Sequence, residues 1–162
     1  MIDHTVHVAD LLRVLLGEGP DTVQAFGGNR MYGEDWEDTA MLTLQFPGGV
    51  FATLDSSWSR PKSYKTWGDV TMNVVGEKGV LEMNMFSQAF DLFAEHTPSH
   101  QIAGYGSDLD GALIADFVGS LMYERPVPIS KDDGWAAVQV ALAGYESAKS
   151  GMPVAPAAHV AC

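Results

Sequence analysis

The sequence is poor in cysteine. The only one is Cys162, the last of 162 residues. This excludes a disulfide within the chain, and it excludes a zinc site built from several thiolates. A single thiol in a chain of this length fits a reducing compartment.

Basic residues and long apolar runs are also scarce. Lys and Arg number 9 against 21 Asp and Glu, which gives a net charge of -12 at pH 7. Such a charge repels phosphate backbones and anionic lipid headgroups. No apolar run approaches the ~18 residues of a membrane span, and the first residues lack the basic and apolar regions of a secretory signal. We therefore expect a cytoplasmic protein with no nucleic-acid and no membrane partner.

The glycines do not form the dinucleotide-binding pattern. None of the 17 glycines builds Gly-x-Gly-x-x-Gly after an expected strand. In that pattern the glycines and the following helix hold a pyrophosphate. We therefore expect no cofactor-binding residue in this chain.

Hydrophobic periodicity predicts a helix, a run of strands and two more helices. Residues 3–16 have helical spacing, with an apolar arc made of Val8, Leu11, Leu12, Leu15 and Leu16. A period of two predicts strands over residues 22–28, 39–46, 50–59, 69–75, 80–85 and 88–94. A loop is expected over 95–106, and helices over 107–122 and 135–149. This order predicts an α+β fold with an open, mostly antiparallel sheet of five or six strands and helices packed on one face.

Acidic residues and a histidine share one side of the first expected helix. Asp3 and His7 are four residues apart, so their side chains are neighbours on a helix. A carboxylate beside an imidazole suits a general base that takes a proton from a hydroxyl group, and Asp10 could orient the ring from the other side. The alternative is a solvated helix face whose acidic first turn favours the helix dipole.

A metal site is a further alternative at the same place. His4 and His7 are three residues apart, and Asp3 and Asp10 would add oxygen ligands. His4 falls within the apolar arc, however, which favours a packed histidine over a metal ligand. We expect no metal-binding residues.

The stretch SSWSRPKSYKTW, residues 56–67, is the only locally basic one. Arg60, Lys62 and Tyr64 at the end of a strand could bind a polyol or a carboxylate. The alternative is an ordinary exposed loop.

Several motifs in order resemble one family. They are Asp3-x-x-x-His7-x-x-Asp10-Leu11, Phe46-Pro47-Gly48-Gly49-Val50, Ser56-Ser57-Trp58, Val75-Gly76-Glu77-Lys78-Gly79 and Tyr145-Glu146-Ser147-Ala148. The first resembles the segment that opens the second domain of the Gfo/Idh/MocA family of NAD(P)-dependent sugar and inositol dehydrogenases. The resemblance implies that residues 1–154 form this C-terminal domain and that 155–162 are a flexible tail.

The resemblance also implies roles. In the family, a Rossmann domain binds NAD or NADP, and the sheet of the second domain commonly forms a dimer or tetramer. Asp3 matches the partner of the substrate hydroxyl, His7 the acid/base histidine, and Asp10 a nearby position. The Rossmann domain and the lysine of the family's Glu-Lys-Pro motif are missing, so we expect a start at an internal methionine of a longer protein, or a gene that lost its first domain.

The expected function is therefore the substrate-binding and oligomerisation half of a sugar or polyol dehydrogenase. By itself it would be inactive in hydride transfer, and it would form a homodimer through the mixed face of the sheet. Two alternatives stay open. One is a standalone dimeric binding or scaffold domain, and the other is a small isomerase or hydrolase that depends on His7.

Overall fold

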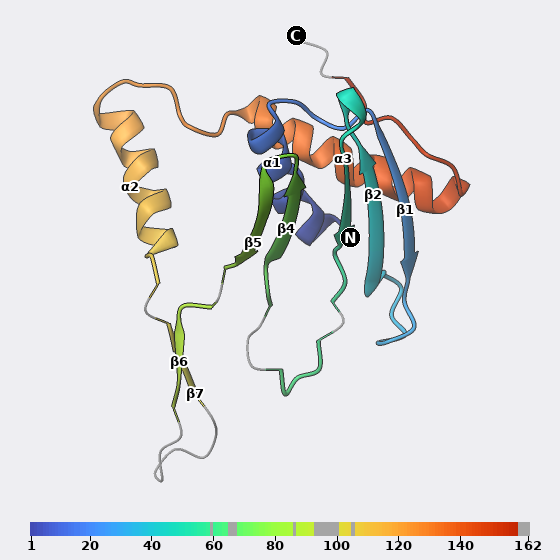
Figure 1. Cartoon of the computed structure of the whole chain (residues 1–162), viewed down its shortest axis with the longest axis horizontal. Helices are drawn as coiled ribbons and strands as arrows, with labels where there is room; N and C mark the ends of the chain where they lie inside the picture. The colour runs from blue at the N-terminus through green and yellow to red at the C-terminus, as the bar shows by residue number, and fades with distance from the viewer. Residues whose placement is uncertain (59, 65–67, 86, 93–100, 105, 159–162) are drawn as a thin grey trace. The chain divides into compact units, whose positions relative to one another are not determined.

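Helices and strands are segregated along the chain, which confirms the predicted α+β class. The computed structural model describes residues 1–58, 60–64, 68–85, 87–92, 101–104 and 106–158 (Figure 1). Their order is α1 (Ile2–Leu16), β1 (Thr22–Gly28), β2 (Thr39–Gln45), a 3-10 turn (Pro47–Gly49), β3 (Phe51–Asp55), β4 (Thr71–Gly76), β5 (Gly79–Asn84), β6 (Ala89–Leu92), β7 (Gln101–Gly104), α2 (Leu109–Met122) and α3 (Lys131–Ser150). The chain divides into two units, Met1–Ser59 with Val127–Cys162, and Arg60–Pro126.

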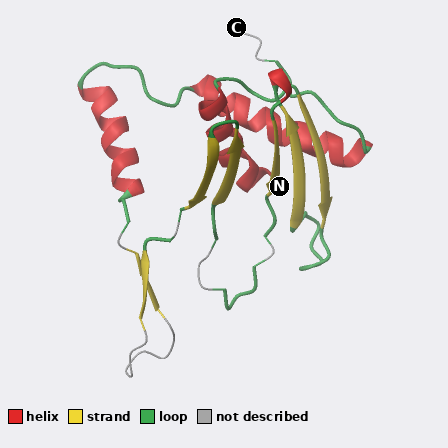
Figure 2. Ribbon diagram, viewed as in Figure 1, coloured by secondary structure: helices red, strands yellow, loops and turns green. Residues whose placement is uncertain are grey.

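The described strands form three antiparallel sheets rather than the single sheet of five or six strands that we expected (Figure 2). These are β1-β2-β3 in the first unit, and the pairs β4-β5 and β6-β7 in the second. Alternation of apolar residues identifies a strand, but it does not specify which neighbour the strand pairs with. The sequence could therefore predict most strands and not their division among sheets.

Two predicted boundaries were wrong. Residues 101–104 were assigned to a loop but form β7, which pairs with β6 from Leu92↔Gln101 to Ala89↔Gly104. Four residues are too few for a clear period of two. Helix α3 begins at Lys131 rather than Trp135, because Ser130 and Asp133 form a reciprocal capping box that adds a turn.

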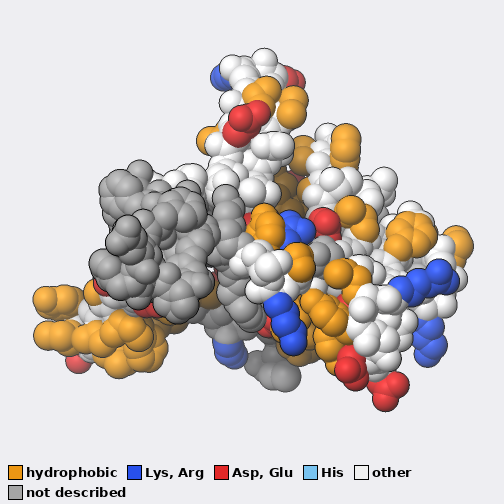
Figure 3. Space-filling model, turned by 90° about the horizontal axis from the view of Figure 1, so that it is seen from below, with side chains coloured by type: hydrophobic (Ala, Val, Ile, Leu, Met, Phe, Trp, Pro, Cys, Tyr) orange, Lys and Arg blue, Asp and Glu red, His pale blue; other side chains and the backbone are white. Residues whose placement is uncertain are grey.

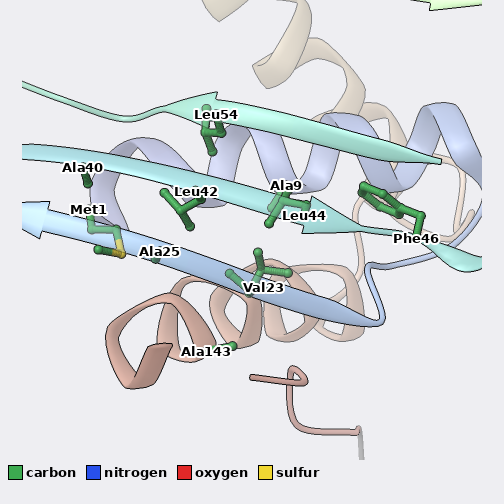
Figure 4. Packing of buried hydrophobic residues seen from close by; sticks show 11 residues of the cluster. Met1, Ala9, Val23, Ala25, Ala40, Leu42, Leu44, Phe46, Leu54 and Ala143 are labelled. Atoms are coloured by element: carbon green, nitrogen blue, oxygen red, sulfur yellow. The ribbon is translucent and has the colours of Figure 1, made fainter. Parts of the chain in front are cut away.

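The three-stranded sheet has one buried and one exposed face. On β2 the alternation is as predicted: Ala40, Leu42 and Leu44 are buried, whereas Met41 and Gln45 are exposed. Helices α1 and α3 cover the buried face (Figure 1). Figure 4 shows the core side chains between these layers.

The predicted apolar arc of α1 is buried only in part, because Val8 and Leu12 pack against the core. Met1, Thr5 and Ala9 are buried, whereas Leu11 and Leu15 are exposed, Leu15 by 63%. Helical spacing shows which side chains lie on the same side of a helix, but it does not show which of them pack against another element. The small side chain of Ala9 lies in the core instead (Figure 4).

The second unit contains the two strand pairs and α2. Asp108 caps α2, because its Oδ1 accepts a hydrogen bond from Gly111 N at 2.8 Å. Near the other end of α2, Arg125 pairs with Asp116 at 2.7 Å. None of the helices in the described ranges has both the length and the apolar character needed to cross a membrane.

Candidate functional site

Asp3 and His7 lie on the first two turns of α1, and both are exposed. The helical spacing that the sequence predicted is therefore present. Within the described part of the chain, the Asp3 carboxylate lies 3.7 Å from His4 Nε2, and His7 has no ion pair or hydrogen bond through its ring. The imidazole of His7 is thus accessible to a ligand, and a catalytic role for Asp3 and His7 stays a prediction.

A carboxylate and a phenol fix the start of α1. Glu37 Oε1 accepts hydrogen bonds from the Met1 ammonium and from the Tyr145 hydroxyl, and Ile2 N donates to that hydroxyl at 3.4 Å. Burial raises the pKa of Glu37, but these hydrogen bonds outweigh it and the net pKa is lowered. Burial, and then the bond to Glu37, raises the pKa of Tyr145. This cluster ties the turn that carries Asp3 to α3 and to the residues before β2.

Asp10 lies among charged side chains between α1 and α3. Its side chain is only 24% exposed, and its Oδ1 is 4.0 Å from Arg13 Nη2. The same nitrogen of Arg13 donates to Asp133 Oδ1 on α3. In this structure Asp10 therefore contributes to the packing of the two helices, and its assignment to substrate binding stays a prediction.

His4 belongs to an aromatic cluster that the sequence analysis missed. Its ring stacks on Trp58, with centroids 5.5 Å apart and planes 18° apart. Trp36 meets Trp58 edge-on at 5.8 Å, and Tyr32 meets Trp36 at 6.0 Å. We call these four rings the aromatic cluster. The sequence does contain one signal of this cluster, since Tyr32 and Trp36 are two aromatic residues in the short acidic segment between β1 and β2.

Asp38 shapes the loop that carries two of these rings. It is 1% exposed, and its Oδ2 accepts hydrogen bonds from the backbone N–H groups of Met31 and Tyr32, both at 2.8 Å. The backbone of Trp58 is tied to the same place, because its N–H donates to Asp38 O at 2.7 Å. The Tyr32 hydroxyl donates to Trp58 O at 3.2 Å. The loop and the residue after β3 are thereby joined.

The predicted substrate residues Arg60, Lys62 and Tyr64 lie in the second unit. Arg60 Nη2 donates to both carboxylate oxygens of Asp69, at 3.0 and 3.2 Å, and its guanidinium lies 5.1 Å from the Tyr64 ring centre. The hydrogen bond to Asp69 and its charge raise the pKa of Arg60. A ligand carboxylate would compete with Asp69, so substrate binding here stays a prediction. Lys65 and Trp67 of the same stretch lie outside the described residues.

Comparison with known proteins identifies the family. The model of the GFO/IDH/MocA C-terminal domain matches residues 1–82. This chain belongs to the GFO/IDH/MocA family. It is 29% identical over 133 residues to 2,7-anhydro-N-acetylneuraminate hydratase of Escherichia coli (strain K12), a match that covers 76% of this chain and 34% of the hydratase.

Solved structures of other proteins share the fold. GenD2 from gentamicin A biosynthesis, in complex with NAD, superposes with a TM-score of 0.78 at 23% identity, over 96% of this chain and 47% of GenD2. A putative myo-inositol dehydrogenase from Sinorhizobium meliloti 1021 superposes with a TM-score of 0.72 at 22% identity, over 96% of this chain and 49% of the other. The chain thus spans less than half of each of these relatives.

The described residues do not fit the dinucleotide that the family implies. The transition from β7 to α2 is the one place in the described ranges where a strand leads through glycines, Gly104 and Gly106, into a helix. There the Gly111 amide is already bonded to Asp108, and Asp110 adds a second carboxylate. Both charges would repel a pyrophosphate at this helix N-terminus. The described residues also contain no group of three His, Cys, Asp or Glu side chains placed to bind a metal ion.

Proposed function

We propose that this chain is the substrate-binding and oligomerisation half of an NAD(P)-dependent oxidoreductase that acts on a hydroxyl group of a sugar or polyol. The observation that carries the proposal is the pair Asp3 and His7, exposed one helical turn apart at the start of α1, in a chain of this family. The similarity in fold to an NAD complex and to a putative inositol dehydrogenase supports it. The dinucleotide would be bound by residues outside this chain.

In this proposal the chain itself binds the substrate and moves one proton. His7 accepts the hydroxyl proton of the substrate on a ring nitrogen. Asp3, one turn away, accepts a hydrogen bond from a neighbouring hydroxyl group and stabilises the imidazolium that forms. The exposed face of β1-β2-β3 joins a second copy of the chain.

A second candidate is favoured by the similarity to the hydratase. Addition of water to a sugar derivative, or its elimination, also needs a base that removes a proton from the substrate. His7 would fill that role as well. The two candidates differ in whether substrate consumption is accompanied by a net change in nicotinamide absorbance.

The test is to substitute His7 in the protein joined to its dinucleotide-binding part. With NAD or NADP and a panel of sugars and inositols, His7→Ala should lower kcat about 10²- to 10⁴-fold, while cofactor affinity stays unchanged. Glu146→Gln, at an exposed position of α3, is the control and should keep the wild-type rate. The 162-residue chain by itself should reduce no NAD or NADP. Cofactor reduction by that chain, or full activity of His7→Ala, would refute the proposal.

A further inference from the structure

The aromatic cluster is the most prominent feature of the first unit that the proposed function leaves unassigned. Its rings come from three separate segments: His4 from α1, Tyr32 and Trp36 from the loop after β1, and Trp58 from beyond β3. All four are partly or largely exposed, Trp36 by 45%. Large aromatic rings gathered at a surface usually mark a place where something binds.

The cluster is held in position before any ligand arrives. The buried Asp38 carboxylate fixes the backbone at Met31 and Tyr32, and the Tyr32 hydroxyl is bonded to Trp58 O. A surface that is already ordered loses less conformational entropy when it binds. The cluster thus resembles a preformed platform more than a set of unrelated exposed side chains.

Its surroundings favour a neutral ligand that carries hydroxyl groups. The Asp3 carboxylate is adjacent, 3.7 Å from His4 Nε2, and the loop carries exposed Glu34 and Asp35. Carboxylates accept hydrogen bonds from hydroxyl groups. Together with the net charge of -12 they repel phosphates and other anions, which disfavours a nucleotide.

A sugar ring has both properties that such a platform requires. The C–H bonds on one face of the ring carry partial positive charge, which the negative face of an aromatic ring attracts. Its hydroxyl groups point outward from the ring edge, where a carboxylate can accept from them. We propose that the aromatic cluster binds the C–H face of a sugar or cyclitol ring and that Asp3 accepts a hydrogen bond from one of its hydroxyl groups.

This inference rests on the proposed function, because Asp3 would then serve both the platform and the reacting centre. Trp36 and Tyr32 are specificity-determining residues in this account. They favour rigid rings over open chains, since an acyclic polyol offers hydroxyl groups but no preformed apolar face.

The test measures binding to the 162-residue chain by ligand-observed NMR titration. The probes are methyl β-D-glucopyranoside and myo-inositol, with acyclic sorbitol as the comparison. Trp36→Ala should weaken binding of the ring compounds roughly three- to tenfold, whereas Trp36→Phe, which keeps a ring, should weaken it less. Trp135→Ala is the matched control, because Trp135 is 44% exposed and lies on α3; it should leave affinity unchanged. A thermal melt of each variant reports whether it remains folded.

Three results would overturn the platform. They are no binding of either ring compound at millimolar concentration, equal affinity for sorbitol, or equal effects of Trp36→Ala and Trp135→Ala. The outcome is separable from that of the proposed function. A Trp36-dependent affinity with no effect of His7→Ala on activity would retain the platform and reject the oxidoreductase role. Loss of activity in His7→Ala with an affinity that does not depend on Trp36 would retain the oxidoreductase role and reject the platform.

Discussion

At the scale of single residues, Glu37 links two distant parts of the first unit. Its carboxylate accepts from Met1 and from Tyr145, and the net pKa is below the ordinary 4.5. Because the folded state favours the ionised carboxylate, the stability that Glu37 contributes is fully present above the pKa that Glu37 has in the unfolded chain. It is lost as pH falls through the folded pKa. The sign of the effect is therefore a loss of stability in acid.

We expect Glu37→Gln to lower the free energy of unfolding at neutral pH by about 1–2 kcal/mol. The variant should also lose less stability than the wild type when the pH is lowered, because the titrating group is gone. Urea denaturation at a series of acidic pH values measures both effects. Glu146→Gln, exposed on α3, should keep the wild-type acid dependence. If the free energy of unfolding falls equally with decreasing pH in Glu37→Gln and in the wild type, this account is wrong.

The residue pairs that the sequence could predict are those set by local geometry. The placement of Asp3 and His7 on one side of α1 follows from helical spacing, and both are found exposed there. The stacking of His4 on Trp58 joins residues that are far apart along the chain, and no local pattern encodes it. For the same reason Tyr32 and Trp36 became candidates only when the fold brought them to Trp58.

At the scale of elements, two glycines of α3 have opposite surroundings. A Cβ added at Gly144 would lie 2.9 Å from Met1 Sδ and 3.1 Å from Leu42 Cδ2, whereas one added at Gly134 would have no atom within 4 Å. Gly144 therefore permits the close approach of α3 to the core. Gly134 has no such packing role.

Alanine at these two positions should have different effects. Gly134→Ala should stabilise the protein by about 0.5–1 kcal/mol, because alanine favours the helix. At Gly144 overpacking costs about 1–3 kcal/mol and offsets that gain, so Gly144→Ala should be the less stable variant. Since both substitutions are in one helix, the difference between their denaturation midpoints isolates packing. Equal midpoints would show that Met1 and Leu42 move aside without cost.

Element boundaries were predictable where the chemistry is local and the segment is long. The alternation of β2 was confirmed because one face lies on the core and the other is exposed. The start of α3 was missed because Ser130-x-x-Asp133 was not recognised as a capping box. The apolar arc of α1 was confirmed only in part: Val8 and Leu12 pack against the core, whereas Leu11 and Leu15 are exposed. Helical spacing does not show which part of an arc another element covers.

At the scale of the whole molecule, apolar side chains remain on several surfaces (Figure 3). One of these surfaces is the open face of β1-β2-β3, which carries Phe26, Met41 and Phe51. Phe26 lies directly opposite Met41 in the β1–β2 register. Since α1 and α3 pack on the other face, this is the face that the proposed homodimer would use.

The proposed homodimer predicts that a charge on this face separates the subunits. Phe26 is 64% exposed in the single chain, so Phe26→Lys should leave the fold intact. In the dimer the lysine would be removed from water beside Met41, and the dissociation constant should rise at least roughly tenfold. Size-exclusion chromatography with light scattering over a range of concentrations measures this change.

Leu15→Lys is the matched control, because Leu15 is 63% exposed but lies on α1, in the helical layer. If Leu15→Lys separates the subunits and Phe26→Lys does not, the chain associates through α1. If the wild type is a monomer at high micromolar concentration, the open sheet face is not a self-association surface.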